Sequence, residues 1–179
     1  MNKTALLVMM SMLSGAAWGA TPKEAQRESE NLAAQAWQAW QGQNFTEAET
    51  AFAQAVEKDP DNANAWNGLG WSQMNQGKAE AAQEAFERCL KVDPRQAAAL
   101  NGLGWIAKNQ GKTEEALKHW KKAVDSLPSA TAAAMGLAQT YEELKQFDEA
   151  AKYYRLVLKY DPQNADVKRQ LENLEKPAP

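Results

Sequence analysis

The sequence predicts an all-α protein built from four repeated helix pairs. The pentapeptide Asn-Gly-Leu-Gly-Trp begins at residue 67 and again 34 residues later, at residue 101. The same shift aligns four prolines, at positions 60, 94, 128 and 162, and three of them follow an aspartate. Apolar residues between these prolines recur with helical spacing, and Gly or Pro interrupts them. Each interval is therefore expected to hold two amphipathic helices, for example over residues 63–76 and 79–92.

Other columns of the 34-residue alignment keep one residue type. A small residue is followed four positions later by an aromatic ring in every unit, as in Ala82 with Phe86. The second unit reads Trp66, Leu69, Gly70, Ala82, Phe86 and Pro94, in the order W-x2-L-G, A-x3-F and P. Over residues 29–162 this period and pattern resemble the tetratricopeptide repeat (TPR) family, with Gln73 in place of its tyrosine. The resemblance implies a right-handed TPR superhelix of four helix-turn-helix repeats.

Numbered by this period, the repeats are expected at residues 29–62, 63–96, 97–130 and 131–164, here called units 1 to 4. Residues 20–28 should extend the first helix, because Thr21-Pro-Lys-Glu24 forms a capping box that starts a helix near residue 22. The narrow apolar stripe of Val167, Leu171 and Leu174 predicts a C-terminal capping helix over residues 165–175. Residues 176–179 should form a loose tail.

Residues 1–19 have the pattern of an export signal. Lys3 precedes a nine-residue apolar run, and small residues then lead to an expected cleavage near Gly19 and Ala20. The run is shorter than the roughly 20 residues that cross a bilayer, so no membrane span is expected after cleavage. The pattern predicts a periplasmic or secreted protein.

Composition and motifs argue against several function classes. The formal net charge is −3 and no basic stripe is present, which disfavours nucleic-acid binding. Cys89 and His119 are the single residues of their types, so neither an intrachain disulfide nor a Cys/His metal site can form. No nucleophile, phosphate-binding or metal-ligand motif is present, so we expect no enzymatic activity and no cofactor. Cys89 is interpreted as a small buried hydrophobic residue.

In TPR proteins the first helices of successive units line a concave surface that usually binds an extended peptide. The resemblance places this surface at the second, fifth, sixth, ninth, twelfth and thirteenth positions of each unit. Tryptophan occupies the ninth position of units 1 to 3. The candidate partner-binding groove is Trp37, Trp40, Asn64, Asn67, Gly68, Trp71, Met74, Asn101, Gly102, Trp105 and Lys108.

The glycines of this groove need a reason, because a glycine inside a helix costs roughly 1 kcal/mol relative to alanine. A helical side chain covers the turn before it, so Trp71 is expected to lie over Asn67 and Gly68. The hypothesis is that the glycine clears a shelf for a flat indole, with the asparagine amide free for a backbone hydrogen bond. Alternatively, the tryptophans pack between first helices and the glycines only ease helix approach.

Several partners fit an aromatic ladder whose rungs are about 10 Å apart, the usual distance between packed helices. An extended or polyproline II segment advances about 9–10 Å in three residues, so a protein or peptide with such a segment is the leading prediction. This would suit a scaffold in envelope assembly, secretion or cytochrome maturation. A glycan or peptidoglycan ligand, or a homo-oligomer that binds its own tail, remains an alternative.

Overall fold

The computed structural model describes residues 21–175, which form nine α-helices and no strand. Residues 1–19, where the export signal is expected, and the tail at 176–179 lie outside the described residues. The helices are α2 (Pro22–Gln41), α3 (Phe45–Lys58), α4 (Ala63–Asn75), α5 (Ala79–Val92), α6 (Ala97–Asn109), α7 (Thr113–Ser126), α8 (Thr131–Glu143), α9 (Phe147–Tyr160) and α10 (Ala165–Glu175).

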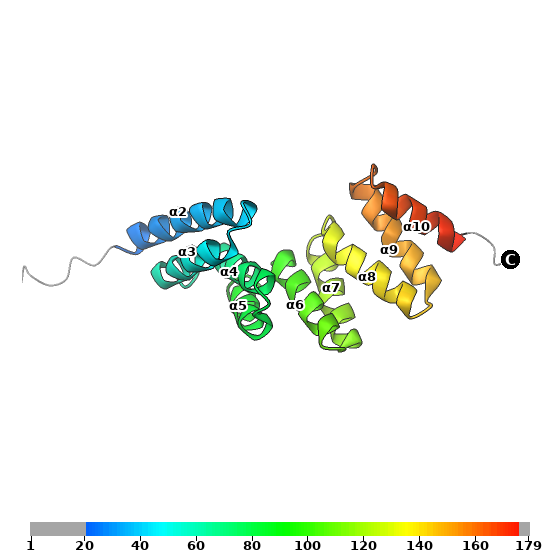
Figure 1. The fold of residues 1–179 in the computed structure, drawn as a ribbon, viewed down its shortest axis with the longest axis horizontal. Coiled ribbons are helices and arrows are strands. Elements are labelled where there is room, and N and C mark those ends of the chain that lie inside the picture. The colour runs from blue at the N-terminus through cyan, green and yellow to red at the C-terminus, as the bar shows by residue number, and fades with distance from the viewer. Residues whose placement is uncertain (1–20, 176–179) are drawn as a thin grey trace, which may run out of the picture.

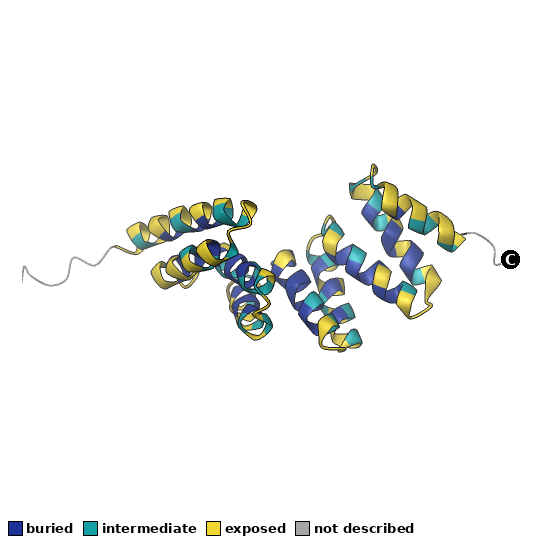
Figure 2. Cartoon of the chain, in the orientation of Figure 1, coloured by how far each residue is buried: buried dark blue, intermediate teal, exposed yellow. Residues whose placement is uncertain are grey.

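The helices pack as consecutive antiparallel pairs, and each pair is followed by the next along one curved array (Figure 1). The pairs are α2 with α3, α4 with α5, α6 with α7 and α8 with α9, and α10 covers the last pair. Buried residues gather where helices face one another, while the outward faces are exposed (Figure 2). The predicted all-α solenoid of four helix pairs is thus confirmed.

Local sequence explains where these helices begin and turn. The backbone N–H of Glu24 donates to Thr21 Oγ1 at 3.3 Å, and the backbone N–H of Thr21 donates to the Glu24 carboxylate at 2.7 Å, which forms the predicted capping box. The turn inside units 2 and 3 uses Gly77 and Gly111, with φ of 75° and 74°. Glycine adopts this left-handed conformation without the steric cost that a Cβ would add. The chain can therefore reverse within three residues in each of these units.

The core follows the second helices. Ala48, Ala82, Ala116 and Ala150 are fully buried, and so are Phe52, Phe86 and Trp120 four residues after the first three. Val167 anchors α10 against the preceding pair, with Leu171 and Leu174 packed around it. The buried apolar residues form three clusters along the stack, and the partly buried Trp66 and Leu90 each pack against two of them.

Candidate partner-binding groove

The tryptophans of the ninth position contact the aromatic ring of their own unit's second helix edge to face. Ring centroids are 5.0 Å apart for Trp37 with Phe52, and 5.5 Å apart for Trp71 with Phe86. Trp105 meets Trp120 in the same way at 5.2 Å. Each of the three first-helix tryptophans is half-buried, whereas its second-helix partner is fully buried. The tryptophans thus pack on the core with one side and retain an accessible side.

The glycines of Asn-Gly-Leu-Gly-Trp make room for these second-helix rings. A Cβ on Gly70 would lie 2.6 Å from a ring atom of Phe86, in its own unit. A Cβ on Gly68 would lie 2.2 Å from Phe52, the ring of the preceding unit. In unit 3, a Cβ on Gly102 would lie 2.4 Å from a ring atom of Phe86, again the ring of the preceding unit. One glycine therefore admits the ring of its own unit and the other admits the ring of the unit before.

The proposed shelf is wrong. The space beside Gly68 and Gly102 is occupied by Phe52 and Phe86, so a flat indole cannot use it. Both glycines are buried. Glycine at the sixth position lets successive units approach closely, which agrees with the part of the alternative that concerned the glycines. Trp71 leans instead on Phe86 of its own unit, at an interplanar angle of 71°.

The asparagines are less accessible than expected. Asn67 and Asn101 retain only 5% and 7% of their exposure, and their Oδ1 atoms are buried without a hydrogen-bond partner in the described structure. A buried acceptor without a partner costs about 1–3 kcal/mol. Asn64, one turn earlier on α4, is exposed. Partner contact at the fifth position would thus require the amide to turn outward, whereas Asn64 is available without rearrangement.

Trp40 and Met74 extend the groove at the twelfth position of units 1 and 2, and both are half-buried. Trp40 packs edge-on against Trp37 and Phe45, with centroids 5.7 and 6.0 Å apart. Its Nε1 is buried and has no partner among the described residues. The N-terminal end of the groove is consequently an aromatic cluster with an unused donor.

Lys108 occupies the twelfth position of unit 3 and bridges to unit 4. Its Nζ donates to Thr140 Oγ1 at 3.2 Å and forms an ion pair with Glu143. Side-chain exposure is 21% for Lys108 and 63% for Glu143, so this pair is only partly screened by water. The Lys108 ammonium is already paired with Glu143, so Lys108 offers a partner mainly its aliphatic stem.

At unit 4 the tryptophan series ends and a hollow of about 530 Å³ opens. Gln139 stands at the ninth position and is exposed. The hollow is lined by Met135, Gln139, Glu142, Glu143, Tyr154, Asp166, Val167 and Gln170. Three carboxylates and no basic side chain line it. The groove residues predicted from the sequence stop short of this hollow, although the same positions in unit 4 are Met135 and Gln139.

Tyr154 forms part of the hollow's inner wall. Its hydroxyl donates to Glu142 at 2.7 Å. Burial raises the pKa of Tyr154, and the hydrogen bond to Glu142 raises it further. The phenol therefore stays protonated as a donor, and Glu142 is held in one place at the edge of the hollow.

Sequence comparison identifies the repeat. A family model described as tetratricopeptide repeat matches residues 33–82, 69–117 and 104–165. The chain belongs to the TPR family. No curated protein sequence matches the TPR chain significantly. Within residues 21–175 no cluster of three or more His, Cys, Asp or Glu could hold a metal ion. No helix in that range is long and apolar enough to cross a membrane.

Solved structures show the same architecture. The chain is similar to pilF of Pseudomonas aeruginosa, with a TM-score of 0.75 and 21% identity over 84% of this chain and 68% of that one. PilW, described as a type IV pilus biogenesis factor, gives 0.71 and 23% identity over 82% and 68%. YrrB, described as a TPR protein with an unusual peptide-binding site, gives 0.61 and 20% identity over 80% and 74%. At these identities the likeness concerns the fold.

Proposed function

We propose that this TPR protein is a non-enzymatic scaffold that holds an extended segment of a protein partner along its first helices. The observation that carries the proposal is the row of half-buried Trp37, Trp71 and Trp105, which ends in the hollow of unit 4. Clustered accessible aromatic rings usually mark interaction surfaces, because tryptophan contributes much contact area at low entropic cost.

The two ends of the groove favour different side chains. Aromatic and apolar surface from Trp40 to Trp105 suits aliphatic or proline residues of an extended segment. Three carboxylates surround the hollow, and each already has one partner: Glu142 has Tyr154, Glu143 has Lys108 and Asp166 has Arg169. Each carboxylate keeps further acceptor capacity, so the hollow suits a basic side chain whose stem would lie on Met135. The preferred partner segment is therefore apolar over most of its length, with a lysine or arginine toward unit 4.

A periplasmic location forms part of the proposal and rests on the export pattern of residues 1–19. Two structural relatives are consistent with a scaffold of this kind. YrrB is described as having a peptide-binding site, and PilW is described as a pilus biogenesis factor. We therefore propose that the scaffold acts in envelope assembly or secretion.

Photocrosslinking in living cells tests the location of the partner. Asn67 and Asn101 are too buried for a bulky photoreactive residue, so Asn64 and Gln139 are the better positions. Glu84 is exposed on α5, a second helix, and serves as the matched control. The same partner should be captured from positions 64 and 139 in the periplasmic fraction and not from position 84. Equal capture from all three positions, or none, would contradict a binding groove on the first helices.

Calorimetry with purified residues 20–179 tests the role of the tryptophans. Peptides with a basic residue beside apolar or proline residues should bind, and Trp71→Ala with Trp105→Ala should weaken binding at least tenfold. Each variant also loses packing on Phe86 or Trp120, so the unfolding midpoint is measured in parallel. Reduced stability with unchanged affinity for the partner would assign these residues to packing alone. Binding of muropeptides instead of peptides would favour a glycan ligand.

A further inference from the structure

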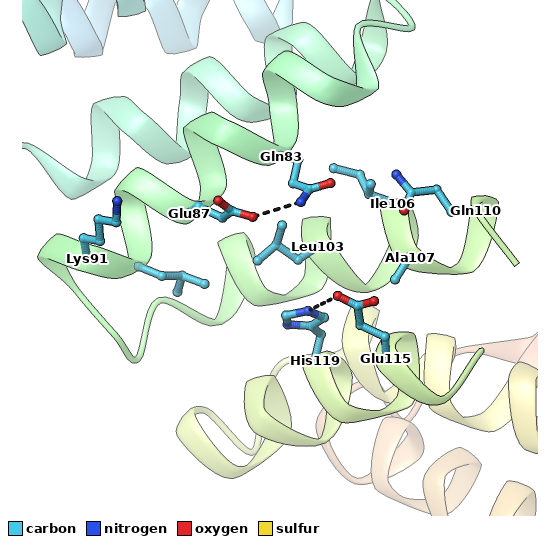
Figure 3. Close-up of a pocket in the computed structure, with 10 residues that line it drawn as sticks. Gln83, Glu87, Lys91, Leu103, Ile106, Ala107, Gln110, Glu115 and His119 are labelled. Carbon is cyan, nitrogen blue, oxygen red and sulfur yellow. Dashed lines mark hydrogen bonds and ion pairs between the residues drawn. The ribbon is translucent and has the colours of Figure 1, made fainter. Parts of the chain in front are cut away.

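A second hollow, of about 370 Å³, lies between α5, α6 and α7 (Figure 3). Leu103, Ile106 and Ala107 of α6 form its floor. Glu87 of α5, and Glu115 and His119 of α7, stand at its rim. None of the residues that line it belongs to the predicted groove. Ala107 lies two residues after Trp105 and therefore points to the other side of α6.

The next junction in the array shows what fits in this place. A shift of 34 residues converts Ala107 to Tyr141 and His119 to Tyr153. The two tyrosine rings are stacked, with centroids 5.8 Å apart and an interplanar angle of 3°. Lys121, at the position of Glu87, places its Nζ 5.5 Å from the Tyr141 centroid. In unit 4, therefore, the chain fills this place with its own aromatic ring.

The preceding junction is filled differently. Gln73 stands at the position of Ala107, next to Glu49. The Glu49 carboxylate accepts hydrogen bonds from Gln76 Nε2 at 2.8 Å and from Lys78 Nζ at 2.6 Å. Polar side chains thus occupy the space between units 1 and 2. Of the three junctions between units, the one between units 2 and 3 has only a methyl group at this position.

The rim of the hollow defines the chemistry of an occupant. The His119 imidazole lies 3.7 Å from the Glu115 carboxylate and occupies the position of the Tyr153 ring, so a planar group can stack on it as Tyr141 does in unit 4. Glu87 accepts a hydrogen bond from Gln83 at 2.9 Å and keeps acceptor capacity for a second donor. Glu115 adds a second carboxylate. Lys91 of α5 also lines the hollow, so the two carboxylates face one ammonium group. Because the carboxylates outnumber it, a ring that carries a neutral hydroxyl donor is favoured over a ring that carries an anion.

We propose that the hollow between α5, α6 and α7 binds a tyrosine side chain of a protein partner, with the ring over Ala107 and against His119 and the hydroxyl directed to a rim carboxylate. This site lies on the opposite side of α6 from the groove. It would let the scaffold hold a second protein segment, or a second part of the same partner, independently of the groove.

The site can be tested with p-cresol, which is the side chain of tyrosine as a free molecule. NMR of residues 20–179 should show saturable shifts of the Ala107 methyl and the His119 ring protons. N-acetyltyrosinamide, which adds backbone amides, should bind at least as tightly, and the anion 4-hydroxybenzoate at least tenfold more weakly. Small apolar cavities in proteins do accept single aromatic rings, so this probe is of suitable size.

Two substitutions make the test specific. Ala107→Tyr should fill the hollow as Tyr141 does, raise Tm by about 2–4 °C for a chain of this size, and abolish p-cresol shifts. Ala53→Tyr adds the same residue at an exposed position of α3, outside both the groove and the hollow, and should leave both unchanged. Tyr141→Ala should open an equivalent hollow in the next junction and add a second set of p-cresol shifts there.

The proposal fails if p-cresol gives no saturable shift at Ala107 and His119, or if Ala107→Tyr leaves those shifts intact. It also fails if Ala107→Tyr lowers Tm, because the hollow would then not have the shape of the ring. Binding of p-cresol without binding of N-acetyltyrosinamide would indicate a site for free phenols and not for a protein side chain. Peptide binding in the groove should be the same in Ala107→Tyr as in the wild type, which separates this result from the groove experiments.

Discussion

Replacing Gly68 by alanine tests whether this glycine serves the packing between units. The new Cβ would lie 2.2, 2.3 and 2.6 Å from three atoms at the far end of the Phe52 ring. Carbon atoms in contact normally lie about 3.5–4.0 Å apart, so the ring or helix α4 must move by more than about 1 Å. Overpacking of this kind costs about 1–3 kcal/mol, and the overlap with three atoms places Gly68→Ala toward the upper end.

The substitution also gains helix propensity, which is worth about 1 kcal/mol for Gly to Ala. The net effect should be a loss of about 1–2 kcal/mol in the free energy of unfolding. Phe52→Leu removes the three atoms that clash. In that background Gly68→Ala should therefore be neutral or stabilising by up to about 1 kcal/mol. The coupling between the two substitutions should be about 2 kcal/mol, well above the error of additivity at distant sites.

Urea unfolding of the wild type, the two single variants and the double variant measures this coupling. A shelf for Trp71 would give a different result, since Gly68→Ala would then change the Trp71 environment without regard to Phe52. If Gly68→Ala is as stable as the wild type, or loses the same free energy with Phe and with Leu at position 52, the packing argument is refuted. Gly102→Ala with Phe86→Leu repeats the test one unit later, where the clash distance is 2.4 Å.

Other properties of the chain can be checked directly. Burial, and secondarily Asp93, raises the pKa of Cys89 to about 12. Its thiol should therefore resist an aromatic disulfide reagent at pH 8 in the folded protein and react fully in guanidinium. Fast reaction of the folded protein would contradict this. Burial lowers the pKa of His119 from 6.5 despite Glu115, so its NMR titration midpoint should fall below that of the unfolded chain. Since the unfolded chain then binds the proton first, the contribution of His119 to stability should decrease as the pH falls below about 6.5, and His119→Gln should remove that part of the dependence. Thr21→Ala removes the Oγ1 atom that accepts from the Glu24 backbone N–H, while the backbone N–H at position 21 can still donate to Glu24. Amide hydrogen exchange should therefore speed up in the first turn of α2 only, and unchanged exchange would show that this bond is dispensable.

The sequence predicted the helix pairs because the signals within each 34-residue repeat act between residues that are close in the chain. Apolar spacing locates the buried face of each helix, and Gly77 or Asp93-Pro94 marks a boundary within a few residues. The capping box at Thr21 is local in the same sense and was predicted with its partner Glu24. The tryptophans were assigned to the first helices for this reason, and whether they bind a partner stays a prediction.

The role of the glycines could not be read from the same period. Gly68 and Trp71 lie on one helix, so the sequence suggested that they contact each other. The atom that fills the glycine's space belongs to Phe52, which comes from a different helix pair. The relative rotation of neighbouring units decides this contact, and no local pattern specifies it. The burial of Asn67 and Asn101 follows from that close approach as well. Ala107 at the family's tyrosine position was a usable signal for the hollow beside α6, and it was missed.

In units 1 to 3 the second-helix ring packs against a glycine that lies 16 residues further along the chain, as Phe52 with Gly68, Phe86 with Gly102 and Trp120 with Gly136. Sixteen residues after Tyr154 the chain has Gln170 instead, and the hollow of unit 4 opens there. In a linear array each unit is stabilised by its neighbours, so the end that lacks this interlock opens first. A partner segment seated in that hollow would supply the missing contact. Binding of a partner segment at unit 4 would then oppose unfolding of this end of the array. The thermal stability of α9 and α10 would rise as more of the groove is occupied.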